Sequence, residues 1–135
     1  MLEPTDTQIV VIGAGQAGLA VSYYLQRLGL EAGQDFVVLD RGPASGGAWQ
    51  SRWPGLRIGT AHRINDLPGM DELGLSFETA DRKAPAREVV ADYYRQYEDH
   101  FAFQIVRPAE VIEVTNRGTD LDVFLRDDDG HVQSV

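Results

Sequence analysis

The segment at residues 9–18 reads IVVIGAGQAG, and it decides the fold expected for this chain. Its first four residues, Ile9 to Ile12, form a continuous apolar run, which is typical of a short strand buried on both faces of a parallel sheet. The run ends at Gly13, where the glycine-rich half of the segment begins. The predicted order is therefore a buried strand, a glycine turn and a helix.

The residues that follow predict a helix and a second strand. From Gln16 to Leu28, apolar residues recur at steps of three and four and form one stripe, namely Ala17, Val21, Tyr24, Leu25 and Leu28. Gly29 stands where a C-terminal cap is expected. Phe36 to Leu39 is another buried-strand run, and two apolar strands joined by a helix imply a right-handed parallel crossover. We therefore expect a βαβ unit over residues 8–40.

The glycine turn has the pattern G-x-G-x-x-G, in which each glycine has a physical role. Gly13 permits the tight turn, Gly15 lets a pyrophosphate approach the backbone, and Gly18 lets the helix and the strand pack closely. The N-terminus of the helix offers N–H groups to the phosphates. Asp40, 22 residues after Gly18, ends the second strand, where its carboxylate can accept hydrogen bonds from a ribose diol. The pattern predicts a dinucleotide site for either FAD or NAD. The alternative is a glycine turn that only packs the helix, with Asp40 a solvated charge.

The middle of the chain predicts a long loop and a second helix. Residues 41–85 show no convincing period and are rich in glycine and proline, but Trp49 and Trp53 favour an ordered, packed loop. Residues 86–102 are expected to form a helix that covers the sheet. Its apolar residues fall on one face, namely Val90, Tyr94, Tyr97 and Phe101.

The last part of the chain, residues 103–135, predicts mainly antiparallel structure. We expect a short strand at Phe103 to Val106 and then a β-meander whose last strand starts near His131. Glycine-containing turns at residues 116–118 and 127–130 separate the meander strands.

Length, charge and cysteine content exclude several classes of function. The 135 residues suggest one domain, and the net charge of −9, from 12 basic and 21 acidic residues, disfavours nucleic acid and acidic membrane surfaces as partners. The absence of cysteine excludes disulfides and redox-active dithiols within these residues. The first eight residues carry two acids and no base, and no apolar run approaches the roughly 18 residues that a membrane span requires. We expect a cytoplasmic protein.

Metal sites are not expected from the sequence. His62, His100 and His131 lie far apart, with no carboxylate at the spacing of a zinc site, so we expect surface or packing histidines. The turn at residues 127–130 reads DDDG but lacks the alternate ligand spacing and the distal glutamate of a calcium loop. We interpret it as a solvated turn.

The order of motifs resembles the flavin-dependent monooxygenase superfamily, which includes flavin-containing and Baeyer-Villiger monooxygenases. The shared features are the glycine fingerprint, the acid after the second strand, the Gly46-Gly47-x-Trp49 element and the Leu67-Pro68-Gly69 loop. The resemblance implies an α/β, Rossmann-like domain with a βαβ start, a parallel sheet, covering helices and a C-terminal meander. It also implies FAD as the cofactor of this segment and NAD(P)H as a cofactor of the full-length enzyme.

The resemblance also implies the residues that contact FAD. The fingerprint would bind the pyrophosphate, Asp40 the adenosine ribose, the Gly47–Trp49 loop the flavin side, and the backbone near Val111 the adenine. The complete set of expected contacts is Gly13, Gly15, Gln16, Ala17, Gly18, Asp40, Arg41, Gly47, Trp49, Arg52 and Val111. No catalytic residue is assigned.

The resemblance further implies that the 135 residues are part of a longer oxidoreductase with a small-molecule substrate. Complete members of the superfamily carry a second glycine fingerprint for the nicotinamide cofactor and a closing Ala-Thr-Gly segment, and neither occurs here. We therefore expect a partial FAD-binding domain with weak or no retention of FAD, no turnover alone, and self-association through an incomplete sheet. Disulfide reductases share the fingerprint but need a dithiol that this sequence lacks. The competing function is a non-catalytic or NAD-binding Rossmann module.

Overall fold

A computed structural model describes residues 6–127 and 129–135 of the chain. The first five residues, part of the stretch in which no secretion signal is expected, lie outside this range. So does residue 128 in the expected turn.

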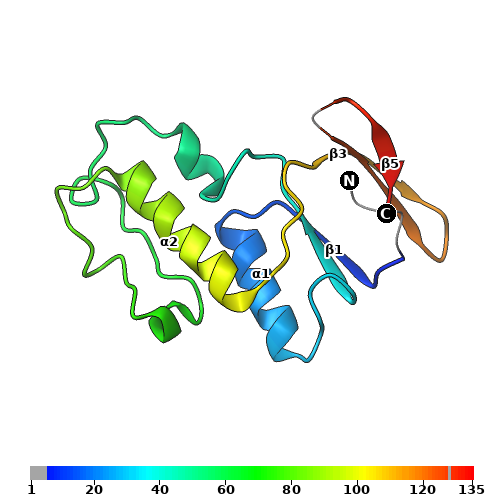
Figure 1. Ribbon diagram of the computed structural model, residues 1–135, viewed down its shortest axis with the longest axis horizontal. Helices are drawn as coiled ribbons and strands as arrows, with labels where there is room; N and C mark the ends of the chain where they lie inside the picture. Colours follow the sequence, from blue (N-terminus) through cyan, green and yellow to red (C-terminus); the bar gives the residue numbers. More distant parts are fainter. Residues whose placement is uncertain (1–5, 128) are drawn as a thin grey trace.

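The N-terminal βαβ unit is confirmed. Strand β1 (Ile9–Ile12) pairs in parallel with β2 (Phe36–Leu39), and helix α1 (Gln16–Arg27) connects them (Figure 1). The helix ends where the sequence predicts. The N–H of Gly29, at a φ of 93°, donates to Gln26, and the N–H of Leu30 donates to Leu25. These two bonds form a Schellman motif, for which the positive φ favours glycine.

Strand β2 is the centre of the core. Phe36 and Val38 point into the cluster formed with the two long helices, whereas Val37 and Leu39 point into the cluster formed with the C-terminal strands. This alternation follows from the two-residue period of a strand, and it buries β2 on both faces. Strand β1 differs from the expectation. Only Val11 is buried, and Ile12 is 58% exposed.

The apolar stripe predicted for α1 does not face the sheet. Val21, Tyr24 and Leu28 are 48%, 57% and 77% exposed, whereas Leu19 and Ser22 are fully buried. The helix is rotated about its axis relative to the expected orientation. Gly18 lies against β1, so Ser22, one turn later, lies on the same buried face, and the predicted stripe turns away from the sheet. The Ser22 hydroxyl is satisfied there by donating to the Gly18 carbonyl oxygen at 2.7 Å.

The strand predicted at Phe103 to Val106 is reduced to a single bridge. Only Val106 pairs with Leu39, in parallel, through bonds from its N–H to Val38 and from the N–H of Asp40 to its carbonyl oxygen. Phe103 instead packs in the helical core. The parallel part of the sheet therefore runs from Val106 through β2 to β1, and the outer edge of β1 has no strand partner among the described residues.

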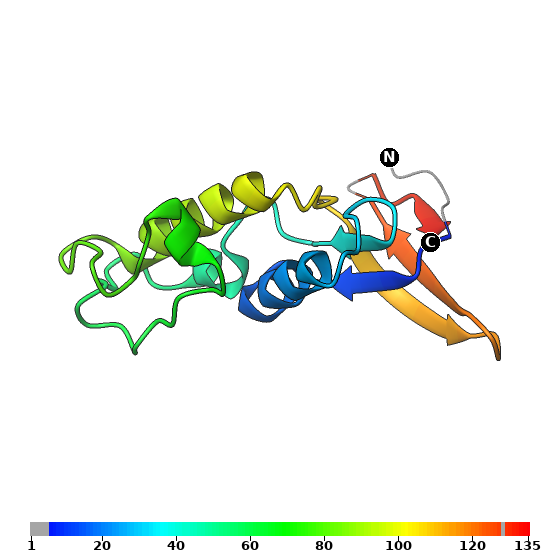
Figure 2. The ribbon, with the colours of Figure 1, turned by 90° about the horizontal axis from the view of Figure 1, so that it is seen from below.

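The long loop is ordered by two 3-10 helices, η1 (Gly47–Ser51) and η2 (Met70–Leu73). Trp49 packs partly against the core, as expected, but Trp53 is 72% exposed, so the prediction that both tryptophans pack was wrong for Trp53. Helix α2 (Ala86–Phe101) follows Pro85 and runs alongside η1 and η2 (Figure 2).

The C-terminal meander is confirmed. Strands β3 (Glu110–Asn116), β4 (Leu121–Arg126) and β5 (Val132–Ser134) pair antiparallel in sequence order. They lie at the opposite end of the elongated molecule from the long loop (Figure 1). Val123 and Leu125 cover the second face of β2. No helix among residues 6–127 and 129–135 is long and apolar enough to cross a membrane.

Two buried tyrosines of α2 give opposite predictions for stability. The Tyr97 hydroxyl donates to the Pro68 carbonyl oxygen at 2.6 Å, whereas the Tyr94 hydroxyl has no partner among the described residues. Burial raises the pKa of Tyr94 to about 12. An unpaired buried hydroxyl costs free energy, so Tyr94→Phe should be neutral or stabilising by up to about 1 kcal/mol, and Tyr97→Phe should destabilise by about 1 kcal/mol or more.

Urea unfolding of both variants measures this difference. The two substitutions remove the same atom from the same helix face, so each serves as the control for the other. An equal loss of unfolding free energy in both variants would contradict the assignment of the Tyr94 hydroxyl as unpaired.

Candidate functional site

The glycine fingerprint lies at the carboxyl end of β1, where α1 begins. The N–H of Gly13 donates to the Leu39 carbonyl oxygen at 2.7 Å and ties the turn to the end of β2. Gly13 has a φ of 97°, a left-handed conformation that residues with a side chain rarely adopt. The turn therefore needs glycine at its first position.

Gly15 and Gly18 face different surroundings. A methyl group on Gly18 would overlap the carbonyl oxygen of Gly13 and lie 2.9 Å from its carbon, so the protein itself fills this space. A methyl group on Gly15 would meet no atom within 4 Å. Gly18 thus lets the helix approach the strand, while Gly15 borders open space.

The first turn of α1 suits an anion beside Gly15. Gly15 is the N-cap residue, and no side chain caps the N–H groups that follow it. No acidic residue lies in this first turn, and Gln16 and Ala17 are both exposed. Free N–H groups and the positive end of the helix dipole attract phosphate groups. An anion could bind here through the backbone alone.

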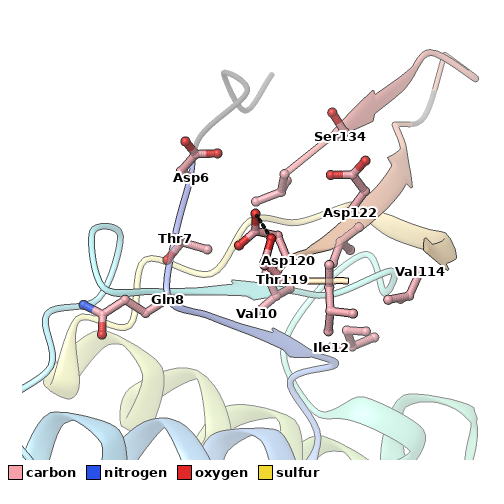
Figure 3. Close-up of a pocket in the computed structure, with 13 residues that line it drawn as sticks. Asp6, Thr7, Gln8, Val10, Ile12, Val114, Thr119, Asp120, Asp122 and Ser134 are labelled. Carbon is pink, nitrogen blue, oxygen red and sulfur yellow. Dashed lines mark hydrogen bonds between the residues drawn. The ribbon is translucent and has the colours of Figure 1, made fainter. Parts of the chain in front are cut away.

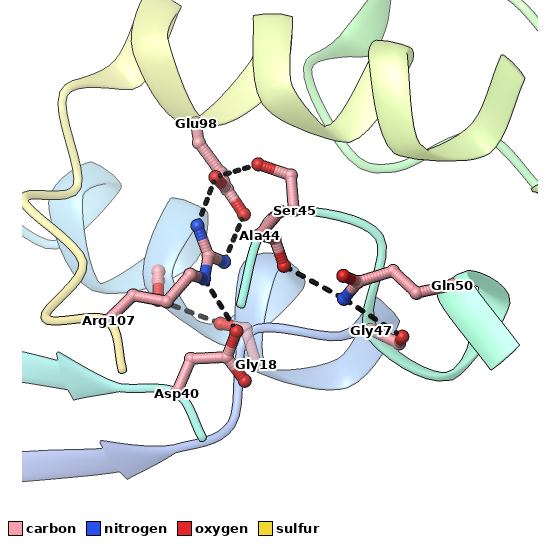
Figure 4. Close-up of polar contacts among 9 residues, drawn as sticks. Gly18, Asp40, Ala44, Ser45, Gly47, Gln50, Glu98 and Arg107 are labelled. Atoms are coloured by element: carbon pink, nitrogen blue, oxygen red, sulfur yellow. Dashed lines mark hydrogen bonds and ion pairs between the residues drawn. The ribbon is translucent and has the colours of Figure 1, made fainter. Parts of the chain in front are cut away.

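The Gly46–Gly47 segment packs between the fingerprint and α2. A methyl group on Gly47 would lie 2.9 Å from the Cα of Gly15, and one on Gly46 would lie 3.1 Å from the Cβ of Ala91. Both glycines have a positive φ, which is 116° at Gly46 and 53° at Gly47. Gln50 closes this turn by donating to the carbonyl oxygens of Ala44 and Gly47 (Figure 4). The segment is thus held directly beside the turn that borders the open space.

Asp40 lies at the end of β2, as expected, but it is buried and ion-paired. Arg107 Nε donates to Asp40 Oδ2 at 2.7 Å, and the same guanidinium group makes two bonds to Glu98 (Figure 4). Ser45 Oγ donates to Glu98 Oε2 at 2.6 Å. Asp40 is therefore not the solvated strand-end charge of the alternative interpretation.

The other expected contacts lie around this centre. Arg52 sits over the Trp49 ring at 5.3 Å from its centroid, so the two form a cation–π pair. Val111 packs against the meander side of β2, two residues after Ala109, whose N–H donates to the Asp40 carbonyl oxygen at 2.7 Å. Arg41, next to Asp40, is exposed.

Ser45, Glu98 and Arg107 were not among the site residues expected from the sequence. One signal was available, because Glu98 falls on the same helix face as Val90, Tyr94 and Tyr97, where a lone acid implies a buried ion pair. Desolvation opposes the charge on Arg107, but its hydrogen bonds to Glu98 and Asp40 outweigh that effect and raise its pKa. The guanidinium group stays charged between two carboxylates.

A cavity of about 790 Å³ lies elsewhere, between the open edge of β1 and the meander (Figure 3). It contains none of the expected cofactor contacts. Its apolar wall includes Ile12, Val114 and Leu121, which are 58%, 47% and 61% exposed. The self-association expected through this edge stays a prediction.

The turn at residues 127–130 does bring three possible metal ligands together. Oxygen or nitrogen atoms of Asp127, Asp129 and His131 lie within 4.8 Å of one another. The Asp127 carboxylate already accepts the backbone N–H groups of Asp129 and His131 at 3.0 and 2.9 Å. Desolvation opposes the charge of Asp127, but bonds from His131 and Asp129 outweigh it and lower the pKa. These hydrogen bonds explain why the three side chains lie close together, so the segment is interpreted as a turn and not as a metal site.

Comparison with known proteins shows the family. The model of the pyridine nucleotide-disulphide oxidoreductase family matches residues 10–133. The uncharacterized oxidoreductase CzcO of Bacillus velezensis is 34% identical over 105 residues, covering 78% of this chain and 28% of CzcO. The Baeyer-Villiger monooxygenase peniC of Penicillium patulum is 37% identical over 71 residues, covering 52% of this chain and 11% of peniC.

Solved structures agree with the sequence comparison. The flavin-containing monooxygenase of Stenotrophomonas maltophilia matches 96% of this chain and 36% of its own, with a TM-score of 0.71 and 33% identity. The expected resemblance and the Rossmann-like fold are confirmed. The chain spans about a third or less of the length of these relatives. It belongs to the pyridine nucleotide-disulphide oxidoreductase family.

Proposed function

We propose that this chain is the FAD-binding segment of an NAD(P)H-dependent flavoprotein oxidoreductase of the monooxygenase type. One observation carries the proposal. At Gly15, at the uncapped N-terminus of α1, the position that a Cβ would occupy has no protein atom within 4 Å, although Gly47 of the neighbouring loop packs against the Cα of Gly15. A turn that served only to pack the helix needs glycine at Gly18, where the protein fills the space, but not at Gly15.

The residues of this chain fit both the adenosine part and the flavin part of FAD. Residues 13–18 would hold the pyrophosphate through backbone N–H groups. The Asp40 carboxylate would accept hydrogen bonds from the ribose hydroxyl groups. The Gly47 loop, with Trp49 and Arg52, would line the flavin side, and the backbone near Val111 the adenine. When bound, FAD supplies the redox chemistry, and this chain supplies binding and orientation.

The activity of the whole protein is part of the same proposal. The flavin monooxygenase and oxidoreductase relatives support NAD(P)H as the reductant and a small molecule as the substrate. The absence of cysteine argues against disulfide reduction by these residues. The cytoplasmic location expected from the sequence belongs to the same proposal.

Asp40→Ala tests the adenosine end of the site. We expect FAD affinity to fall roughly tenfold to a hundredfold, because hydrogen bonds to a charged group contribute about 1.5 to 3 kcal/mol. Since retention of FAD through purification is expected to be weak, the measurement is an equilibrium titration followed by flavin fluorescence. The affinity for flavin mononucleotide, which lacks the adenosine, should stay unchanged.

Circular dichroism establishes that both proteins are folded. An unchanged FAD affinity in the folded variant would contradict the role of Asp40. Binding of NAD but not FAD by the unsubstituted chain would instead favour an NAD-binding Rossmann module.

A further inference from the structure

Arg107 bridges two buried carboxylates that come from different parts of the fold. Its Nε donates to Asp40 Oδ2 at 2.7 Å, and its two terminal nitrogens donate to Glu98 at 2.8 and 3.1 Å. The side chains of Arg107, Asp40 and Glu98 are 14%, 9% and 8% exposed. All three nitrogens of the guanidinium group are used, which fixes its plane and its position.

The bridge links the three segments that border the proposed FAD site. Asp40 ends β2, Glu98 belongs to α2, and Ser45, which donates to Glu98 at 2.6 Å, directly precedes Gly46 and Gly47. Figure 4 shows the guanidinium group between the two carboxylates, with Ser45 on the far side of Glu98. A displacement of Arg107 would therefore reach both the end of β2 and the glycine loop.

The two oxygens of Asp40 are in different states. Oδ2 is held by Arg107, while Oδ1 accepts no bond from any residue within 6–127 and 129–135. Oδ1 is also not a buried unpaired atom, because the Tyr94 hydroxyl is the one such atom of the described residues. One carboxylate oxygen is thus anchored, while the other accepts no hydrogen bond from the described residues and keeps some exposure to solvent.

The charges favour this arrangement. Two carboxylates and one guanidinium group leave the cluster with one net negative charge, and without Arg107 the two buried acids would repel each other. The second acid, Glu98, positions the arginine, while Asp40 keeps a free oxygen.

We propose that Arg107 is a positioning residue that aims Asp40 Oδ1 at the hydroxyl groups of the adenosine ribose, and that Glu98 and Ser45 hold Arg107 in place. This inference rests on the proposed function, since it needs an adenosine ligand at Asp40. It adds three residues to the site that make no expected contact with the ligand themselves.

The test measures how well the chain distinguishes ligand hydroxyl groups. ADP, 2′-deoxy-ADP and 3′-deoxy-ADP are titrated at up to millimolar concentration into the unsubstituted chain and into Arg107→Lys. Lysine keeps the charge but cannot bond to both carboxylates in the same fixed plane. We expect the unsubstituted chain to prefer ADP over at least one deoxy analogue by roughly tenfold, and Arg107→Lys to reduce that preference to about twofold.

A second variant controls for effects of the net charge of the cluster and of misfolding. Arg107→Gln together with Glu98→Gln keeps one net negative charge in the cluster and leaves Asp40 unanchored. We expect this folded variant to show the same loss of preference. A merely structural role would weaken all three nucleotides equally and leave the preference at its original ratio.

The outcomes separate the two proposals. A preference that persists in both folded variants would overturn the positioning role and leave the proposed function intact. Equal binding of all three nucleotides by the unsubstituted chain would overturn the positioning role as well. No binding of FAD or ADP by the unsubstituted chain would overturn the proposed function and this inference with it.

Discussion

Gly15→Val should abolish FAD binding by this chain while leaving its folding intact. The position has an extended backbone with a φ of −86°, which valine adopts readily, and a Cβ there meets no atom within 4 Å. The free energy of unfolding should therefore fall by no more than about 1 kcal/mol, because valine is less favoured than glycine at an N-cap. The added side chain would occupy the space proposed for the pyrophosphate, so FAD affinity should fall by roughly a hundredfold or more.

Fluorescence titration with FAD and urea unfolding measure the two effects on the same protein. Gly15→Ala is the graded control, because its smaller side chain should reduce the FAD affinity in part and the stability by no more than about 1 kcal/mol. A Gly15→Val variant that binds FAD as well as the unsubstituted chain would show that the pyrophosphate does not lie over this turn.

Gly18→Ala should do the reverse and destabilise the fold. A single methyl group there would overlap the carbonyl oxygen of Gly13 and approach the Val11 side chain to 3.6 Å. Because the obstruction is backbone, α1 can accept the methyl group only by moving away from β1. Overpacking of this kind costs about 1 to 3 kcal/mol or more, a large part of the stability of a small domain.

Urea or thermal unfolding, followed by circular dichroism, measures the loss. Gly15→Ala is again the matched control, with the same chemical change three residues away. If Gly18→Ala and Gly15→Ala had the same unfolding free energy, the contact between α1 and β1 at Gly18 would not be as the structure places it.

The sequence predicted the parts of the fold that depend on local sterics. The glycine turn, the Schellman end of α1 at Gly29 and the meander turn at Gly118 all need positive φ, and glycine marks such positions directly. The apolar face of α2 was also predicted correctly, since Val90, Tyr94 and Tyr97 are fully buried.

The rotation of α1 was not predicted, although the information was present. Hydrophobic periodicity favoured the face that carries Val21 and Leu28, but the fingerprint requires Gly18 to lie against β1, and this turns Ser22 inward. A backbone contact with no room for a side chain outweighs the preference of an apolar stripe for burial. Val21, Tyr24 and Leu28 of the stripe stay exposed, while Leu25 packs partly against the core.

The buried charges were the part of the site that local patterns could not supply. The Asp40 carboxylate was expected to accept hydrogen bonds from a ribose diol, but its pairing with Arg107, 67 residues away in the chain, was not foreseen. Arg107 reaches Asp40 because the chain pairs Val106 with Leu39 in the folded protein. This pairing is a single bridge, so no strand pattern in the sequence indicates it. Glu98 on an apolar helix face was the one indication of such a pair.

The residues of this chain that contact FAD can be identified from backbone amide chemical shifts. An isotope-labelled sample of the chain is titrated with FAD, and the shift of each assigned amide signal is followed. We predict the largest changes at residues 13–18, with further changes at Asp40 and at Gly46 and Gly47. Changes confined to the cavity between β1 and the meander, or no change at millimolar FAD, would contradict the proposed site.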